Sequence, residues 1–93
     1  MKVIQSRSFQ KKVKKFTKAH KAILDEVVRE IIKNPDIGEQ KKGDLKDVLV
    51  HKFKLGNSQY LLAYRYSKNL LELIMIGFHQ NYHRDLKTYL KNV

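Results

Sequence analysis

Three strand-like runs follow one another in the stretch "VLVHKFKLGNSQYLLAYRYSKNLLELIMIG" (48–77). Their β-branched and aromatic residues favour extended structure. The runs are separated by "GNS" (56–58) and "SKN" (67–69), and connections this short join antiparallel neighbours. The stretch therefore predicts a three-stranded antiparallel meander, with strands over residues 48–55, 59–66 and 70–77.

The first hairpin of this meander has two chemically different faces, because alternate residues of a strand point to opposite sides of the sheet. If Lys52 pairs near Ala63, one face carries three cations and the other is mainly apolar. The apolar face is suited to packing against helices, and the cationic face is suited to binding an anion. The cationic face would comprise Val50, Lys52, Lys54, Leu61, Ala63 and Arg65, and the apolar face Leu49, His51, Phe53, Leu62, Tyr64 and Tyr66.

The chain between Phe9 and Lys33 contains no Gly or Pro and carries apolar residues at helical spacing. One unbroken helix over this range would be about 37 Å long, whereas a compact domain of this size is roughly 32 Å wide. The apolar stripe also lapses at "TKAHK" (17–21), where Thr17 is a good helix cap. We therefore expect a helical hairpin bent near residues 17–21, with Pro35 preventing its second helix from continuing.

The two ends of the chain and one charged segment complete the predicted order of elements. "KVIQS" (2–6) predicts a short strand, and Ser8 is the expected cap of the helix that follows. Segment 36–47, with two glycines and dense charge, predicts a loop, and a helix is expected from about residue 79. The predicted fold class is α+β, with an N-terminal strand, a helical hairpin, an antiparallel three-stranded meander and a C-terminal helix (β-α-α-β-β-β-α). Residues 1–93 are expected to form a single domain, because two would each be too small to bury a core.

Charge is the strongest compositional signal. Twenty Lys and Arg residues against nine Asp and Glu give a net charge of +11. A domain with this net charge is expected to bind polyanions, and nucleic acid is the commonest polyanion in a cytosol. An acidic protein partner, or a surface that only confers solubility, would also account for the charge.

The sequence offers no sign of export or of a membrane span. It has no cysteine, which suits a reducing, cytoplasmic location. The most apolar window, "LLELIMIGF" (70–78), is too short to span a bilayer and contains Glu72. The N-terminus has no apolar signal region. We therefore expect a cytoplasmic protein without a membrane partner.

The order of elements, together with two segments, resembles the RelE/ParE superfamily of bacterial toxins. These segments are "KGDLKDVLVHKFKLGNSQYLLAYRY" (42–66) and "IGFHQNYHRDLKTYL" (76–90). The "KGDLK" loop, the Lys-x-Lys strand, the "YLLAY" strand and the "IGFH" strand exit carry most of the resemblance. It extends over nearly the whole chain.

The resemblance implies a toxin of a type II toxin–antitoxin pair. RelE-like members cleave mRNA in the ribosomal A site, and ParE-like members poison DNA gyrase; a small antitoxin neutralises both in a hetero-oligomer. The positive charge favours the first branch, because the ribosome presents RNA phosphate. The expected partners are a cognate antitoxin and the ribosome, through 16S rRNA and A-site mRNA, and no cofactor is expected.

Metal-free RNA cleavage requires a base for the 2′-OH, cations for the charged transition state and an acid for the departing 5′-oxygen. The resemblance matches Lys52 and Lys54 to the paired cations of the central strands, where they would hold the scissile phosphate. Many RelE-like sequences have Arg where this chain has Leu61, and Arg65, which has the same strand parity, is the candidate replacement. The alternative interpretation is that the lysines form a solvated strand surface.

His79 lies at the predicted strand exit, where YafQ-like members have a histidine, and His83 follows one helical turn later. An imidazole exchanges protons readily near neutral pH. We therefore expect His83 or His79 to act as general acid or base, with Asp85 orienting an imidazole or acting in its place. The alternative is that both histidines are exposed residues of a helix surface.

The same segment is not expected to bind metal. The spacing of His79 and His83 suits helical zinc ligands, but the residues between them include no Glu, and the chain has no cysteine. Tyr82 is instead expected to stack on a base. The predicted RNA contacts are Lys46, Lys52, Lys54, Arg65, Tyr82 and Arg84.

An apolar strip is expected beside the strand cations. The C-terminal helix should cover part of it, and the antitoxin part. The strip would consist of Leu61, Ala63, Leu73 and Met75.

Three functions remain open from the sequence: a ribosome-dependent mRNA endoribonuclease, a non-catalytic gyrase inhibitor, and a basic RNA-binding domain without toxicity. The histidine pair and the strand lysines favour the first, because gyrase inhibition requires no acid/base groups.

Overall fold

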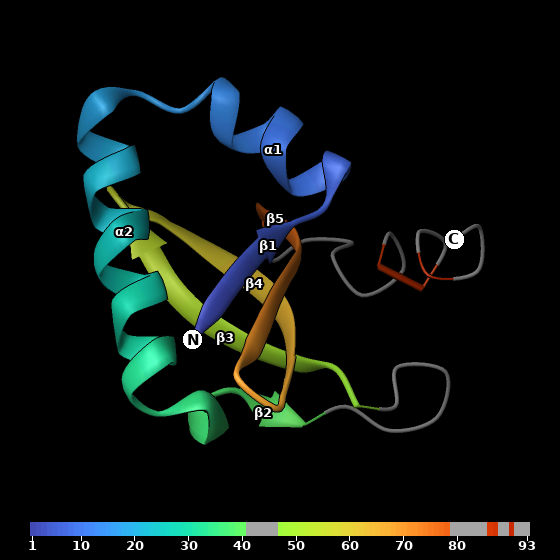
Figure 1. Ribbon diagram of the computed structural model, residues 1–93. Helices are drawn as coiled ribbons and strands as arrows, with labels where there is room; N and C mark the ends of the chain where they lie inside the picture. Colours follow the sequence, from blue (N-terminus) through green and yellow to red (C-terminus); the bar gives the residue numbers. More distant parts are fainter. Residues whose placement is uncertain (41–46, 79–85, 88–89, 91–93) are drawn as a thin grey trace.

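The computed structural model describes residues 1–40, 47–78, 86–87 and 90. Within these residues the fold is α+β, as predicted, and is built around a five-stranded sheet of order β1-β5-β4-β3-β2 (Figure 1). β1 is parallel to β5, and the other neighbouring strands are antiparallel. The elements are β1 (Lys2–Gln5), α1 (Arg7–Lys14), α2 (Lys18–Lys33), the 3₁₀ helix η1 (Pro35–Ile37), β2 (Glu39–Gln40), β3 (Leu49–Leu55), β4 (Ser58–Ser67) and β5 (Leu70–Phe78).

The predicted helical hairpin is confirmed, and its bend falls between α1 and α2. Thr17 caps α2 by accepting a hydrogen bond from the backbone N–H of His20, and α2 ends at Lys33, before Pro35. The cap of α1 was predicted wrongly. Ser6, which has extended backbone and accepts from Phe9 N–H, caps α1, whereas Ser8 lies inside its first turn.

The predicted faces of the first hairpin are confirmed, although its register differs. Lys52 lies opposite Leu61, and Ala63 lies opposite Val50. The register differs from the prediction by two residues because β3 and β4 are joined by a two-residue turn, in which Gly56 adopts a positive φ of 62°. A shift by two residues leaves every side chain on its predicted face.

The predicted face of Leu73 was wrong because β5 contains a bulge. Tyr64 lies opposite Leu73 and Ala63 lies opposite Met75, so Ile74 is an extra residue in β5. The bulge breaks the alternation of side chains along the strand. Leu73 therefore packs on the helix-covered face, and Ile74 takes its predicted place beside Met75.

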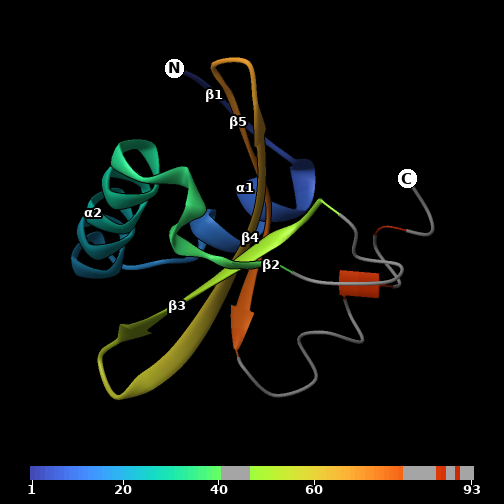
Figure 2. The ribbon, with the colours of Figure 1, turned by 90° about the horizontal axis from the view of Figure 1, so that it is seen from below.

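The sheet separates two apolar clusters. The larger cluster lies beneath α1 and α2 and includes Phe9, Ile31 and Tyr64. The smaller one lies on the opposite face and includes Val50, Leu61 and the fully buried Leu86. Figure 2 shows residues 86–87 and α2 on opposite sides of the sheet.

Leu86 and Leu90 therefore cover part of the face that carries Lys52 and Lys54. Leu86 and Lys87 are helical, in agreement with the predicted C-terminal helix, whose start near residue 79 lies outside the described residues. The extent of a single domain over residues 1–93 stays a prediction.

The segment predicted as a loop after α2 contains local structure. η1 and the two-residue strand β2 follow α2, and β2 pairs with the start of β3. Tyr64 holds this connection in place: its hydroxyl donates to the carbonyl oxygen of Pro35 at 2.6 Å and accepts from Gly38 N–H at 2.9 Å. Periodicity in the sequence did not indicate these interactions, because they join residues far apart in the chain.

Candidate functional site

Lys52 and Lys54 point to the same side of β3, away from α1 and α2, and both are exposed. Residues two apart on a strand are separated by about 7 Å, so both ammonium groups can approach one phosphodiester. Lys52 lies opposite Leu61, which lies opposite Gly77 on the next strand. Lys52 is therefore level with Gly77, the residue before the last of β5, and Lys54 lies two residues farther toward the same end of the sheet.

Arg65 does not join the two lysines. It lies four residues from Leu61 along β4, which corresponds to about 13 Å. Its Nη1 atom is 3.7 Å from Oε1 of Glu72, the residue opposite it on β5. The predicted cationic site is therefore divided, with the lysines and Arg65 toward opposite ends of the sheet.

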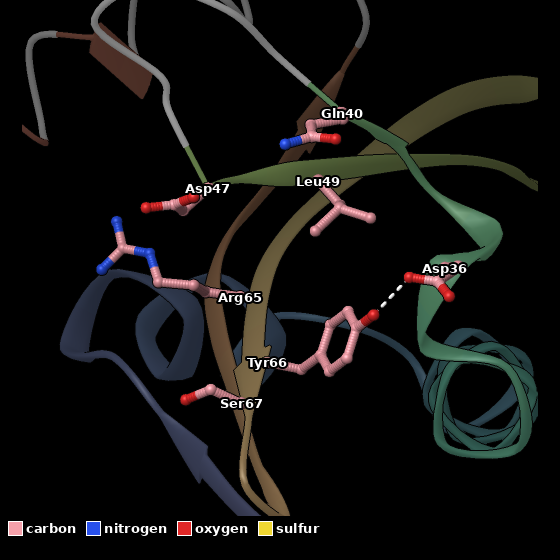
Figure 3. Close-up of a pocket in the computed structure, with 7 residues that line it drawn as sticks. All are labelled: Asp36, Gln40, Asp47, Leu49, Arg65, Tyr66 and Ser67. Carbon is pink, nitrogen blue, oxygen red and sulfur yellow. Dashed lines mark hydrogen bonds between the residues drawn. The ribbon is translucent and has the colours of Figure 1, made fainter.

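Arg65 instead lines a pocket of about 440 Å³ that contains acidic groups (Figure 3). Its side chain extends toward Asp47, while Tyr66 points toward Asp36 and donates a hydrogen bond to it. That bond raises the pKa of Tyr66. Carboxylates repel phosphate, so this pocket is a poorer RNA site than the surface around Lys52. The pocket is lined by Asp36, Gln40, Asp47, Leu49, Arg65, Tyr66 and Ser67.

Two histidines lie in the described part of the chain, and both pack on the helix-covered side. His51 of β3 is half-buried, and burial lowers its pKa, while the charge of Glu30 opposes that effect. His20, in the first turn of α2, has its ring centroid 6.2 Å from that of Phe16. Neither imidazole lies on the face that carries Lys52 and Lys54.

The remaining predicted site residues lie outside the described residues. They are the proposed acid/base groups and the proposed additional RNA contacts, and their roles stay predictions. These residues are Lys46, His79, Tyr82, His83, Arg84 and Asp85.

An aromatic cluster at the end of the sheet was not anticipated from the sequence. The rings of Tyr60 and Phe78, from opposite positions on β4 and β5, have centroids 4.5 Å apart. Phe16 meets the Tyr60 ring edge-on, and Phe78 is 56% exposed. The sequence signal was an aromatic residue near the start of β4 and another at the end of β5, but only the register shows that the two are neighbours.

In the described ranges there is no group of three or more His, Cys, Asp or Glu residues placed to hold a metal ion. Among the same residues, no helix is long and apolar enough to cross a membrane.

The family model for ParE-like toxins of type II bacterial toxin–antitoxin systems matches residues 3–87. The chain belongs to this family. It is thus a type II toxin of the RelE/ParE superfamily, as the sequence resemblance implied. No curated protein matches the sequence.

Solved toxin structures show the same fold. The YoeB/ParE toxin from Agrobacterium tumefaciens has a TM-score of 0.71 at 20% identity, covering 85% of this chain and 99% of that one. The toxin–antitoxin complex RelBE from E. coli has a TM-score of 0.67 at 21% identity, covering 85% of this chain and 96% of that one. An arginine double mutant of E. coli RelE in the free state has a TM-score of 0.71 at 18% identity, covering 98% and 94%.

In this toxin, position 61 does not supply a strand cation. Leu61 is fully buried in the cluster beneath residue 86. A guanidinium there would need a buried partner. Since Arg65 lies toward the other end of the sheet, the described part of this face holds two cations, Lys52 and Lys54, near the end of β5.

Proposed function

We propose that this toxin is a ribosome-dependent mRNA endoribonuclease that stops translation without using a metal ion. The observation that carries the proposal is the exposed pair Lys52 and Lys54 level with the end of β5. The chain passes from that end directly to His79. Cations for the charged transition state and a group that transfers protons, the role proposed for His79 or His83, are what phosphodiester cleavage by an internal hydroxyl requires.

In the proposed reaction, the 2′-oxygen of one nucleotide attacks the adjacent phosphorus and the bond from phosphorus to the 5′-oxygen breaks. A base accepts the 2′-OH proton, and an acid donates a proton to the departing 5′-oxygen. The products are a 2′,3′-cyclic phosphate and a free 5′-OH. Lys52 and Lys54 stabilise the extra negative charge on phosphorus-bound oxygens, and His79 or His83 transfers protons, assisted by Asp85.

Mapping mRNA 5′ ends after brief expression tests the proposal. We expect growth to stop with translation, and cuts to appear inside translated codons. Lys52→Ala should greatly reduce the cuts, whereas Lys33→Ala, a change of the same kind at the end of α2, should not. Intact mRNA with blocked DNA supercoiling would contradict the proposal.

The histidines are tested separately from the lysines. His79→Ala or His83→Ala should slow cleavage by about 10²–10⁴-fold if that histidine transfers a proton. Ribosome binding should survive, because it rests on many phosphate contacts. The pH profile of cleavage should keep an imidazole inflection in Lys52→Ala. If the double histidine variant is folded and as toxic as the parent, these residues are not the acid and base.

A second candidate is gyrase inhibition without catalysis. The matching family model favours it, because that family is described as ParE-like. The division of the predicted cations between two ends of the sheet also fits a protein-binding surface better than a nuclease site. Supercoiling by purified gyrase in the presence of the toxin distinguishes this candidate from the first.

The same face is proposed to bind the antitoxin in a toxin–antitoxin hetero-oligomer. Lys52 and Lys54 share this face with Met75, which lies two strands away on β5 and is partly buried. An antitoxin segment with carboxylates and apolar residues would match both features. Binding of antitoxin should therefore exclude RNA from this face.

A further inference from the structure

A second surface combines aromatic rings with cations, on the other side of the sheet. A hollow of about 240 Å³ lies where the connection between α1 and α2 meets the start of β4 and the end of β5. Among the residues that the structure describes, neither Lys52 nor Lys54 of the proposed cleavage site lines it. Its lining residues are Lys12, Lys15, Phe16, Thr17, His20, Tyr60, Gly77 and Phe78.

The rings in this hollow leave one aromatic side chain open to solvent. Tyr60 and Phe78 are tilted by 36° with centroids 4.5 Å apart, and Phe16 supports the Tyr60 ring edge-on at 5.9 Å. Phe78 nevertheless remains 56% exposed. A ring held by neighbours yet open to solvent is a surface on which a flat ligand can stack at little cost in side-chain entropy.

The cations around the hollow extend beyond it along α1. Lys12 and Lys15 line the hollow itself, and a second hollow of about 220 Å³ is lined by Arg7, Gln10, Lys11 and Lys14. The stretch 7–21 contains no acidic residue. Its cations are Arg7, Lys11, Lys12, Lys14, Lys15, Lys18 and Lys21.

We infer that this hollow binds an unpaired RNA nucleotide, with its base on the Phe78 ring and the neighbouring phosphates on Lys12 and Lys15. Stacking rings beside a cationic track are the combination that single-strand binders use, and every base offers a face for stacking. A purely apolar peptide would leave the lysines unused, and a segment with carboxylates and aliphatic residues would not need a flat ring face. A nucleotide offers both a flat base and a phosphate. Charge and ring geometry together therefore favour RNA.

The site is distinct from the proposed cleavage surface but close to the same end of the sheet. Phe78 lies opposite Tyr60, on the face that carries the helices, whereas Lys52 and Lys54 point to the other face. A single strand passing around the end of β5 would thus contact both. The inference rests on the proposed function only in taking RNA as the ligand, and it adds a contact for a nucleotide outside the scissile bond.

Binding of short oligonucleotides to the full chain tests the stacking contact. The probe is a fluorescein-labelled hexamer of uridine, with fluorescence anisotropy as the readout and a hexamer of abasic nucleotides as the matched ligand. Phe78→Leu, which keeps an apolar side chain but removes the ring, should weaken binding of the uridine hexamer by about 5- to 100-fold. It should leave the affinity for the abasic hexamer unchanged. Equal affinity of the parent for both hexamers would overturn the inference.

The phosphate contacts have their own test. Replacing both Lys12 and Lys15 with Ala should flatten the dependence of log affinity on log salt by about 1.4, or 0.7 for each lost phosphate contact in a single strand. The matched control replaces Lys33 and Lys68, two exposed lysines at the far end of α2 and in the turn between β4 and β5. A control that flattens the slope as much as the test variant would overturn the assignment. Thermal melting of each variant checks that it is folded.

The position of the base is tested by NMR. Stacking should move the ring-proton resonances of Phe78 and Tyr60 upfield on addition of the uridine hexamer but not of the abasic one. If Phe78→Leu instead weakens binding of the antitoxin and leaves RNA binding unchanged, the hollow is a protein-docking surface and the inference is wrong.

Failure of this inference is distinguishable from failure of the proposed function. Ribosomal cleavage that persists while uridine stacking on Phe78 is absent rejects the hollow alone. If uridine stacks on Phe78 but the parent toxin does not cleave mRNA, the proposed endoribonuclease activity is wrong. The proposed RNA contact in the hollow would then still hold.

Discussion

Tyr64 shows how one residue connects the sheet to the segment after α2. Its side chain is completely buried, yet its hydroxyl bonds to two backbone groups of that segment. The ring lies so close to Gly38 that a Cβ atom there would come within 2.8 Å of the hydroxyl oxygen. Position 38 therefore excludes a side chain because of space, not because of its backbone angles.

Tyr64→Phe should lower the free energy of unfolding by about 1–3 kcal/mol, because two backbone groups lose a buried partner. Urea denaturation followed by circular dichroism measures this. Tyr66→Phe is the control, since its hydroxyl bonds to Asp36 at an exposed position. A loss in the control as large as in Tyr64→Phe would contradict the role assigned to the buried hydroxyl.

His51 should make stability depend on pH. Burial lowers its pKa from the ordinary value of 6.5, so the folded state binds the proton less readily than the unfolded chain. The contribution to stability is complete above pH 6.5 and is lost as pH falls from there toward the lower folded pKa. Melting temperatures between about pH 7.5 and 5 should fall less steeply in His51→Gln than in the parent. Parallel profiles would contradict the prediction.

At the scale of the elements, the junction between β1 and α1 is tied to the bulge in β5. Ser6 Oγ accepts the capping bond from Phe9 N–H and donates to the carbonyl oxygen of Ile74, the extra residue of the bulge. β1 adds to the sheet parallel to β5 just before this point. One serine thus fixes both the start of a helix and the place where the strand alternation breaks.

Ser6→Ala should destabilise the fold by about 0.5–2 kcal/mol, the range for loss of a helix cap. Ser8→Ala is the matched control, because Ser8 lies inside α1 and should change stability by less than about 0.5 kcal/mol. Chemical denaturation of the two variants and the parent decides between them. A larger loss in Ser8→Ala would support the cap that the sequence predicted instead.

At the scale of the whole molecule, the net charge and the small size together give a high density of positive charge. A net charge of +11 is carried by a molecule whose Cα atoms have a radius of gyration of 12.4 Å. Such a charge density produces a long-range attraction for RNA and for acidic protein segments, and salt screens it.

The association rate with the antitoxin should therefore fall by about 10-fold or more when salt is raised from low to physiological concentrations. The dissociation rate should change much less, because it depends on short-range contacts. Stopped-flow mixing at a series of salt concentrations measures both. An association rate that does not respond to ionic strength would show that steering by charge is unimportant.

Sequence periodicity alone determined most of the fold. The helical hairpin, the meander and the two faces of β3 and β4 follow from local repeats of apolar residues, and they survive a register change of two because side chains alternate with period two. The tertiary structure decided what depends on contacts between distant residues. The bulge at Ile74 places Leu73 on the helix-covered face. The register of β3 on β4 separates Arg65 from Lys52. The pairing of β4 with β5 places the Tyr60 ring beside the Phe78 ring. Local patterns specify which side of an element is apolar, but the position of one strand along another depends on turn geometry and bulges, which the apolar pattern does not report.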